Sequence, residues 1–228
     1  DGILARFTTA YQRLVVEVAG VDLSKPGDAT DPPCWSWPEY RGYDKKVISE
    51  VWSRIKTSHD FWMGLSELPD CCTLRTLILD LQRWHEVYFV TSRVGKDVKW
   101  QTEQWLMLHL QIDRPTVLIS SEKGLVAKAL KLDVYVDDNA DNANDAVLKT
   151  LPPAYENGIW KPLNQPGDMP STRVYLIDKS YNRETGVPEE MFVDSNRLQQ
   201  ILKNLLSNAL KFTEKGRVTM RTRIVEGK

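Results

Sequence analysis

Three short stretches decide the predicted fold: VYFVTSR at 87–93, TVLISSEKG at 116–124 and VYVDDNADN at 134–142. Each begins with β-branched and aromatic residues and ends in polar or charged ones. Apolar residues at helical spacing lie between them, at 101–110 and 124–130. Short apolar strands that alternate with helices are typical of βαβ units around a parallel sheet. The sequence therefore predicts an α/β fold with an open, Rossmann-like parallel sheet.

Helical and loop patterns precede these strands. Apolar residues at helical spacing predict helices within residues 1–20, 44–57 and 74–84. Residues 21–43 are rich in Pro, Gly and Trp and predict a loop. A fourth strand is predicted at 174–177, where β-branched and aromatic residues again gather.

Two later stretches depart from the alternation. Residues 151–172 hold five prolines without a clear period, which indicates a surface insertion. Further on, Asp194 can cap a helix that ends at Gly216, and residues 217–225 alternate like a half-exposed strand. Residues 194–228 carry eight Lys or Arg against three Asp or Glu, a balance of +5, whereas the whole chain has a net charge of -1. A positively charged C-terminal helix–strand segment therefore follows an α/β part whose net charge is negative.

Composition excludes several classes of protein. The chain has 228 residues, of which 42% are hydrophobic and 27% charged, an ordinary globular balance. Its near-zero net charge argues against a nucleic-acid-binding chain, and its apolar runs fall short of the roughly 20 residues that a membrane span needs. Three cysteines, Cys34, Cys71 and Cys72, fit neither a disulfide framework nor a zinc site. Reduced thiols and the absence of a visible signal peptide predict a cytoplasmic protein.

Polar side chains follow the predicted strands at the point where each one ends. Thr91 follows the first strand, Lys123 the second, and Asp137 with Asp138 the third. The carboxyl ends of parallel strands lie at one rim of a sheet, where ligands bind. Paired carboxylates suit a hard cation such as Mg²⁺, and a hydroxyl with an ammonium group suits phosphoryl oxygens. The sequence therefore predicts a site for a phosphate and Mg²⁺.

The order of DG, VYFVTSR, SSEKG and VYVDDNADN resembles the four motifs of the haloacid dehalogenase superfamily of phosphatases. Between them, DGILARF, EYRGYD and HDFWMGLSELPD look like the 5'(3')-deoxyribonucleotidases. The resemblance covers about residues 1–183 and implies a small helical cap at about 15–75. It also implies a phosphoric monoester hydrolase that uses Mg²⁺ and acts on nucleoside monophosphates through an aspartyl-phosphate.

The resemblance implies a role for individual residues. Asp1 matches the general acid/base, Thr91 the hydroxyl of the second motif, and Lys123 the lysine that neutralises the phosphoryl charge. Asp137 and Asp138 match the acidic pair that binds Mg²⁺. The residues implied to contact the substrate are Ser92, Arg93, Phe61 and Trp62, although the last two are also explained by packing inside the cap.

The nucleophile of this family would lie two residues before Asp1. We therefore expect residues 1–228 as they stand to be catalytically incomplete. The strand that carries the nucleophile is central in the family, so the sheet is expected to have a gap. The strand predicted at 217–225 is a candidate to fill it.

A second resemblance covers residues 187–228, within a predicted C-terminal segment at 184–228. VPEEMFVDSNRLQQILKNLLSNALKFTEKGRVTM looks like the start of the ATP-binding domain of a sensor histidine kinase. Asn204, Asn208 and Lys211 fall at i, i+4 and i+7 on one helical face, where the family's N box binds Mg²⁺ and ATP phosphates. The glycine-rich motifs of the ATP lid do not appear before Lys228, so the resemblance implies an incomplete nucleotide pocket.

Two partial families in one chain leave three interpretations open. The first is a chimera in which a phosphatase-like domain precedes a kinase-derived segment. The second is a signalling fragment derived from a histidine kinase. The third is a non-catalytic binding module that keeps affinity for Mg²⁺ or a nucleotide.

Overall fold

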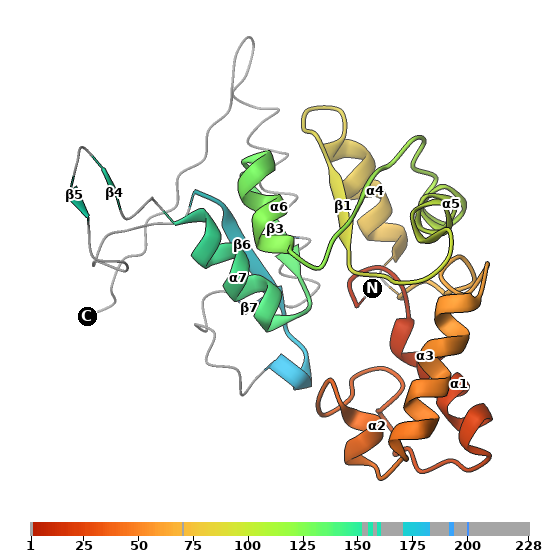
Figure 1. Cartoon of the computed structure of the whole chain (residues 1–228). Coiled ribbons are helices and arrows are strands. Elements are labelled where there is room, and N and C mark those ends of the chain that lie inside the picture. The colour runs from red at the N-terminus through yellow and green to blue at the C-terminus, as the bar shows by residue number, and fades with distance from the viewer. Residues whose placement is uncertain are drawn as a thin grey trace.

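The computed structural model describes residues 2–69, 71–151 and 171–182, the backbone of 155–156, 159–160 and 192–193, and residue 200. The elements are α1 (Phe7–Ala19), α2 (Trp37–Tyr40), α3 (Lys45–Thr57), α4 (Cys71–Leu81), β1 (Tyr88–Thr91), α5 (Val98–Leu110), β2 (Thr116–Ile119), α6 (Lys123–Leu130), β3 (Val134–Asp137), α7 (Ala140–Thr150), β4 (Tyr155–Glu156), β5 (Ile159–Trp160), β6 (Arg173–Ile177), the 3-10 turn η1 (Ser180–Asn182) and β7 (Phe192–Val193). Figure 1 shows their arrangement.

Local sequence signals place most of these elements. Helix α1 ends at Gly20, which adopts the left-handed backbone (φ 68°) that glycine takes without strain. Helix α3 begins after Asp44, whose side chain accepts a hydrogen bond from the Lys46 amide, as an N-cap does. The helices predicted within 1–20, 44–57, 74–84, 101–110 and 124–130 and the four predicted strands are confirmed, with ends that shift by a few residues. The helix predicted between Asp194 and Gly216 lies, apart from residue 200, outside the described residues. Two helices, α2 and α7, were not predicted.

The strands form small separate sheets instead of one open sheet. β1 pairs in parallel with β2, and β6 pairs in parallel with both β3 and β7, while β4 and β5 form an antiparallel pair. Within the described residues β1 and β3 share no ladder, so the predicted Rossmann-like arrangement is not confirmed. The strand predicted at 217–225 lies outside the described residues. The fold is a mixed one of helices and small parallel sheets.

The larger hydrophobic core, here called the aromatic core, joins the N-terminal helices to β2 and α5. Its buried members are Ala5, Tyr11, Val15, Trp37, Tyr43, Ile48, Val51, Ile55, Trp62, Leu65, Cys71, Trp105, Leu106, Leu110, Ile112 and Val117. The region predicted as a cap, 15–75, thus shares its core with α5 and β2. The predicted division into domains at 183 stays a prediction.

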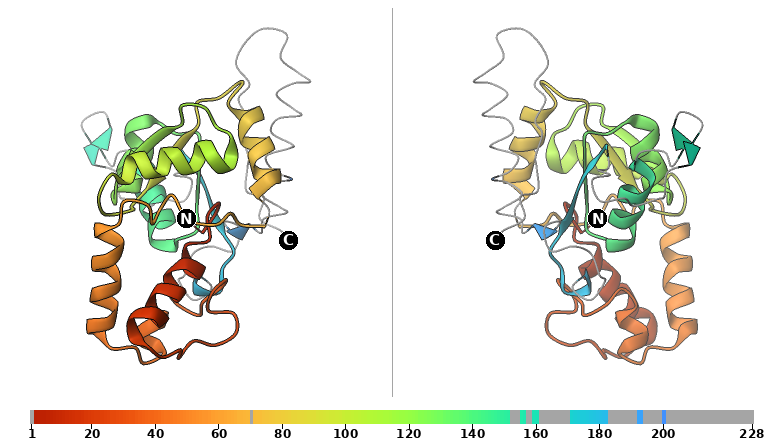
Figure 2. Two further views of the ribbon diagram at one scale, coloured as in Figure 1. Left: turned by 90° about the vertical axis from the view of Figure 1, so that its right-hand side faces the viewer. Right: turned by 90° about the vertical axis from the view of Figure 1, so that its left-hand side faces the viewer.

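The smaller core, here called the alanine core, lies where α6 and α7 pack on β3 and β6 (Figure 1). Its buried members are Ala127, Tyr135, Ala140, Ala143, Ala146, Val174 and Leu176. Small side chains let the two helices approach each other and the sheet closely. In both views of Figure 2, helices α6 and α7 lie apart from the N-terminal helices α1 and α3.

No helix in the described ranges is long and apolar enough to cross a membrane.

Candidate functional site

A buried ion pair lies at the carboxyl end of β3. Lys123 is the first residue of α6, and its Nζ donates to Asp137 Oδ2 at 2.9 Å. Asp137 is the last residue of β3, and the two side chains are 11% and 4% exposed. The strand-end pattern in the sequence predicted these residues at one site, and the structure brings them together. The pair places a positive and a negative charge side by side beneath the rim.

Four donors saturate the Asp137 carboxylate. Oδ2 accepts from Lys123 and from the Tyr135 hydroxyl, and Oδ1 accepts from the Asn139 amide at 2.9 Å and Asn142 Nδ2 at 3.1 Å. Burial raises the pKa of Asp137, but the Lys123 ammonium and these hydrogen bonds outweigh burial and lower it. Burial and the neighbouring Asp137 raise the pKa of Tyr135, which therefore stays a donor. Asp137 is a fixed anion that orients Lys123.

Asp138 is held in a different way. Its Oδ2 accepts from the Tyr181 hydroxyl at 3.0 Å, and its backbone carbonyl accepts from Asn182 Nδ2 at 2.9 Å. Asp138 Oδ1 accepts no hydrogen bond from the described residues, although the residue is only 7% exposed. A side-chain carbon on Gly2 would overlap the Asp138 carboxylate, so the N-terminal backbone approaches this residue closely.

Asp1, the predicted general acid/base, lies outside the described residues. Its neighbour Gly2 is the residue that contacts Asp138. Ile3 then packs with Val136 and Ile177 at the ends of β3 and β6. Gly2 and Ile3 therefore lie at the same end of the sheet as Asp137 and Asp138.

Thr91 and Ser92 lie at the carboxyl end of β1. The Thr91 carbonyl accepts from the Ser120 amide at 2.9 Å, which ties the end of β1 to the loop leading to Lys123. The Thr91 side chain is half-buried and Ser92 is exposed. Neither side chain hydrogen-bonds to Lys123 or Asp137 within the described residues. These two residues are joined to the ion pair through the backbone.

The remaining predicted substrate contacts lie in or beside the aromatic core. Trp62 is 3% exposed, and its indole Nε1 donates to the Val94 carbonyl at 3.0 Å. Phe61 is half-buried and meets Trp62 edge-on at 5.0 Å between ring centroids. The packing interpretation describes Trp62 well, whereas Phe61 keeps part of its surface exposed.

Arg93 is buried next to Trp62. Its guanidinium lies 5.1 Å from the Trp62 ring centroid and donates to Thr102 Oγ1 at 3.1 Å. Burial lowers the pKa of Arg93 to about 10, so the group remains charged at neutral pH. The cation–π contact and the hydrogen bond orient it inside the fold.

Within the described residues, no group of three or more His, Cys, Asp or Glu side chains is placed to hold a metal ion. Proteins often bind Mg²⁺ through one or two carboxylates, with waters and substrate phosphates completing the shell. Asp138 fits that pattern through Oδ1, whereas the acceptor positions of Asp137 are used by Lys123, Tyr135, Asn139 and Asn142.

Sequence reasoning missed the residues that orient this site. Tyr135 and Asn142 bond to Asp137, and Tyr181 and Asn182 bond to Asp138. The alternation of β3 signals that Tyr135 shares a face with Asp137, because residues two apart in a strand point the same way. No local signal marks Tyr181, which follows β6 and reaches Asp138 across 43 residues of sequence.

Comparisons with known proteins bear on the C-terminal segment. No family model matches the chain. A stretch of 41 residues is 54% identical to the aerobic respiration control sensor protein ArcB of Escherichia coli strain K12, and the same match occurs to that protein from Shigella flexneri. It covers 18% of this chain and 5% of each sensor protein. This short match fits the segment that resembles a histidine kinase, and the comparisons give the phosphatase resemblance no support.

The kinase-like residues Asn204, Asn208 and Lys211 lie outside the described residues. Their predicted role in binding nucleotide and Mg²⁺ therefore stays a prediction.

Proposed function

We propose that the rim formed by the ends of β1, β2 and β3 binds a phosphate monoester together with Mg²⁺, as in a nucleoside monophosphate phosphatase. The observation that carries the proposal is the buried Lys123–Asp137 pair (2.9 Å) next to Asp138. Burying two charges is costly unless they are paired and fully hydrogen-bonded, and such groups gather at functional sites. The resemblance of the strand-end motifs to the haloacid dehalogenase superfamily supports the same site.

Each residue has a defined part in this proposal. Asp137 accepts from the Lys123 ammonium and directs it to the rim, where its remaining protons can meet phosphoryl oxygens. The Thr91 hydroxyl is a second donor at the end of the neighbouring sheet. Asp138 offers one carboxylate oxygen to Mg²⁺, and a bound Mg²⁺ would neutralise phosphate charge. Asp1 is proposed as the group that exchanges a proton with the leaving oxygen.

The substrate class follows from the resemblance and from the position of the cap-like helices. Phe61 is the partly exposed aromatic residue that we propose to contact the base, with Trp62 and Arg93 behind it as packing and orienting groups. Ser92, exposed after Thr91, is proposed as a further donor to the phosphate.

The experiment is a thermal-shift titration of the full chain with Mg²⁺ and a deoxynucleoside monophosphate, separately and together. We expect stabilisation by the pair of ligands, because a ligand that binds only the folded state raises its stability. Asp138→Asn should abolish the Mg²⁺-dependent part. Asp133→Asn is the matched control, since Asp133 is an exposed aspartate five residues earlier in the chain. Equal shifts in wild type and Asp138→Asn would contradict the proposal.

We propose a second function for residues 184–228: a histidine-kinase-derived segment that contacts ATP. The match to ArcB, 54% identical over 41 residues, favours it. In the proposal Asn208 holds Mg²⁺ and Lys211 meets the nucleotide phosphates, with Asn204 on the same helical face.

Titration with Mg²⁺–ATP tests the second function. Binding that is lost in Lys211→Ala and kept in Lys203→Ala would support it, since Lys203 belongs to the same predicted helix but to another face. Binding of ATP that both variants retain would contradict it. A deoxynucleoside monophosphate separates the two sites, because it should bind without any dependence on Lys211.

A further inference from the structure

Consecutive residues of η1 hold Asp138 from one side. The Tyr181 hydroxyl donates to Asp138 Oδ2 at 3.0 Å, which ties down one oxygen of the carboxylate. Asn182 Nδ2 donates to the Asp138 carbonyl at 2.9 Å and to the Ile177 carbonyl at 3.1 Å, which ties η1 to the end of β6. One short turn therefore fixes both the backbone and the side chain of the proposed Mg²⁺ ligand.

The loop between α1 and α2 holds η1 from the other side. The Asp31 carboxylate accepts from the Ser180 amide at 3.0 Å and from the Ser180 hydroxyl at 2.7 Å. The Trp35 ring lies 4.5 Å from the Tyr181 ring, between centroids, at an interplanar angle of 52°. Two residues of this loop thus contact the turn that carries Tyr181, across 149 residues of sequence.

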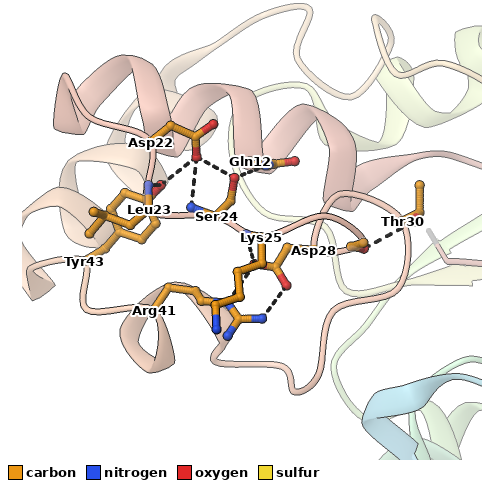
Figure 3. Close-up of polar contacts among 10 residues, drawn as sticks. Gln12, Asp22, Leu23, Ser24, Lys25, Asp28, Thr30, Arg41 and Tyr43 are labelled. Carbon is orange, nitrogen blue, oxygen red and sulfur yellow. Dashed lines mark hydrogen bonds and ion pairs between the residues drawn. The ribbon is translucent and has the colours of Figure 1, made fainter.

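The loop is itself fixed by a buried ion pair, drawn in Figure 3. Arg41 donates twice to the carboxylate of Asp28, through Nε and a terminal nitrogen, each at 2.8 Å. Asp28 is 2% exposed and also accepts from the Lys25 amide at 2.8 Å. Thr9 Oγ1 of α1 donates to the Ala29 carbonyl at 2.7 Å. These bonds hold residues 25–41, here called the brace, in one arrangement, and the two-pronged arginine–carboxylate contact sets its geometry.

We propose that Tyr181 is a positioning residue for Asp138 and that Asp31 and Trp35, on this brace, hold Tyr181 in place. The Tyr181 hydroxyl occupies Oδ2 and leaves Oδ1 as the oxygen that meets Mg²⁺. Without the hydroxyl the carboxylate can rotate away from the rim. Partners of this kind commonly change the affinity of a metal ligand by tenfold or more. The inference rests on the proposed Mg²⁺ site.

Calorimetric titration of the full chain with Mg²⁺ tests the positioning role. Tyr181→Phe, which removes only the hydroxyl, should weaken Mg²⁺ binding about tenfold. Tyr88→Phe is its control, since the Tyr88 hydroxyl lies outside the brace and donates to the exposed Glu86 side chain. Trp35→Leu should weaken binding less, and Trp35→Phe should restore it because the ring remains. Trp100→Leu is the control for Trp35, because the two indoles are 50% and 49% exposed.

The double variant Trp35→Leu/Tyr181→Phe separates a relay from general damage. If the brace acts on Asp138 through the Tyr181 hydroxyl, the double variant binds Mg²⁺ as weakly as Tyr181→Phe alone. Mg²⁺ should also change the tryptophan fluorescence of the wild type and leave that of Trp35→Leu unchanged. Additive losses in the double variant would overturn the role of the brace.

Two further outcomes distinguish this inference from the proposed function. If Asp138→Asn abolishes Mg²⁺ binding while Tyr181→Phe binds as the wild type does, the Mg²⁺ site stands and the positioning role is overturned. If the wild type binds no Mg²⁺, the proposed site fails, and this inference fails with it.

Discussion

The aromatic core and the alanine core stabilise their surroundings by different means. The aromatic core buries five large rings, of Tyr11, Trp37, Tyr43, Trp62 and Trp105. Four of the seven buried members of the alanine core are alanines. Apolar burial contributes in proportion to area, so the alanine core gains much less from it.

Charged and polar groups occupy the region around the alanine core. Asp137 and Asp138 are 3% and 7% exposed there, and each has its own set of donors. The region with the smaller apolar core is therefore also the one that holds the candidate site. The stability of this region depends more on individual hydrogen bonds and ion pairs, so single substitutions can remove them separately.

The largest expected effect lies in the aromatic core. Trp105 is 1% exposed, and its Nε1 donates to the Leu65 carbonyl at 2.7 Å. Trp105→Ala should lower the free energy of unfolding by about 3–5 kcal/mol, the cost of truncating a buried aromatic residue. Trp100→Ala, at a half-exposed indole on the same helix, should change it little. Urea denaturation measures the free energy of unfolding of both variants. Similar losses in the two variants would contradict the prediction that burial decides the cost.

The buried ion pair is the next most sensitive feature. Lys123→Met leaves the Asp137 carboxylate buried without its cation, and should cost about 3 kcal/mol of unfolding free energy. The double variant Lys123→Met/Asp137→Leu should recover part of this loss, because it removes the stranded charge. A double variant that is less stable than the single one would show that Asp137 is held mainly by its other donors.

Acid should act on the same pair. The pKa of Asp137 is lower in the folded chain than in the unfolded one, because Lys123 and the hydrogen bonds outweigh burial. Its contribution is therefore present above the unfolded pKa, about 4, and is lost as pH falls through the folded value. Between pH 5 and pH 3 the wild type should lose more unfolding free energy than Asp137→Asn does. Equal losses would assign the acid sensitivity to other carboxylates.

Close helix packing around the alanine core predicts a smaller effect. A methyl group on Gly124 would meet the backbone oxygen of Asp145 at 2.6 Å, inside van der Waals contact. Gly124→Ala should therefore cost about 1–3 kcal/mol. Gly64→Ala is the matched substitution near the aromatic core, where the nearest atom is the Asp60 oxygen at 3.3 Å, and should cost less. Thermal unfolding of the two variants measures the difference, and the reverse order would contradict it.

The sequence predicted most local elements because their signals are local. Strand 116–119 was predicted with the bounds it has, and Gly20 ends α1 as expected. Helix α7 was missed because its buried face is Ala140, Ala143 and Ala146, which hydrophobic periodicity does not emphasise. Strand pairing was predicted poorly, because it joins residues that lie far apart in the sequence.

The candidate site was predicted in the same uneven way. Lys123 and Asp137 were placed together because parallel strands end at a common rim, a rule that needs only the order of elements. Tyr181 reaches Asp138 only because the turn after β6 folds back, and Trp35 reaches Tyr181 only because the brace is ordered. Packing was predicted as an alternative role for Trp62, and the structure places Trp62 in the aromatic core.

The smallest expected effect lies on the surface of the N-terminal helices. Arg54 of α3 pairs with Glu17 of α1 at 2.9 Å and with Glu50 of its own helix at 3.0 Å. All three side chains are exposed, so water and salt screen the attraction and ordering the side chains opposes it. Arg54→Gln should leave the melting temperature unchanged at physiological salt, in contrast to Lys123→Met. A clear drop in melting temperature that added salt abolishes would show that this exposed network helps to join α1 to α3.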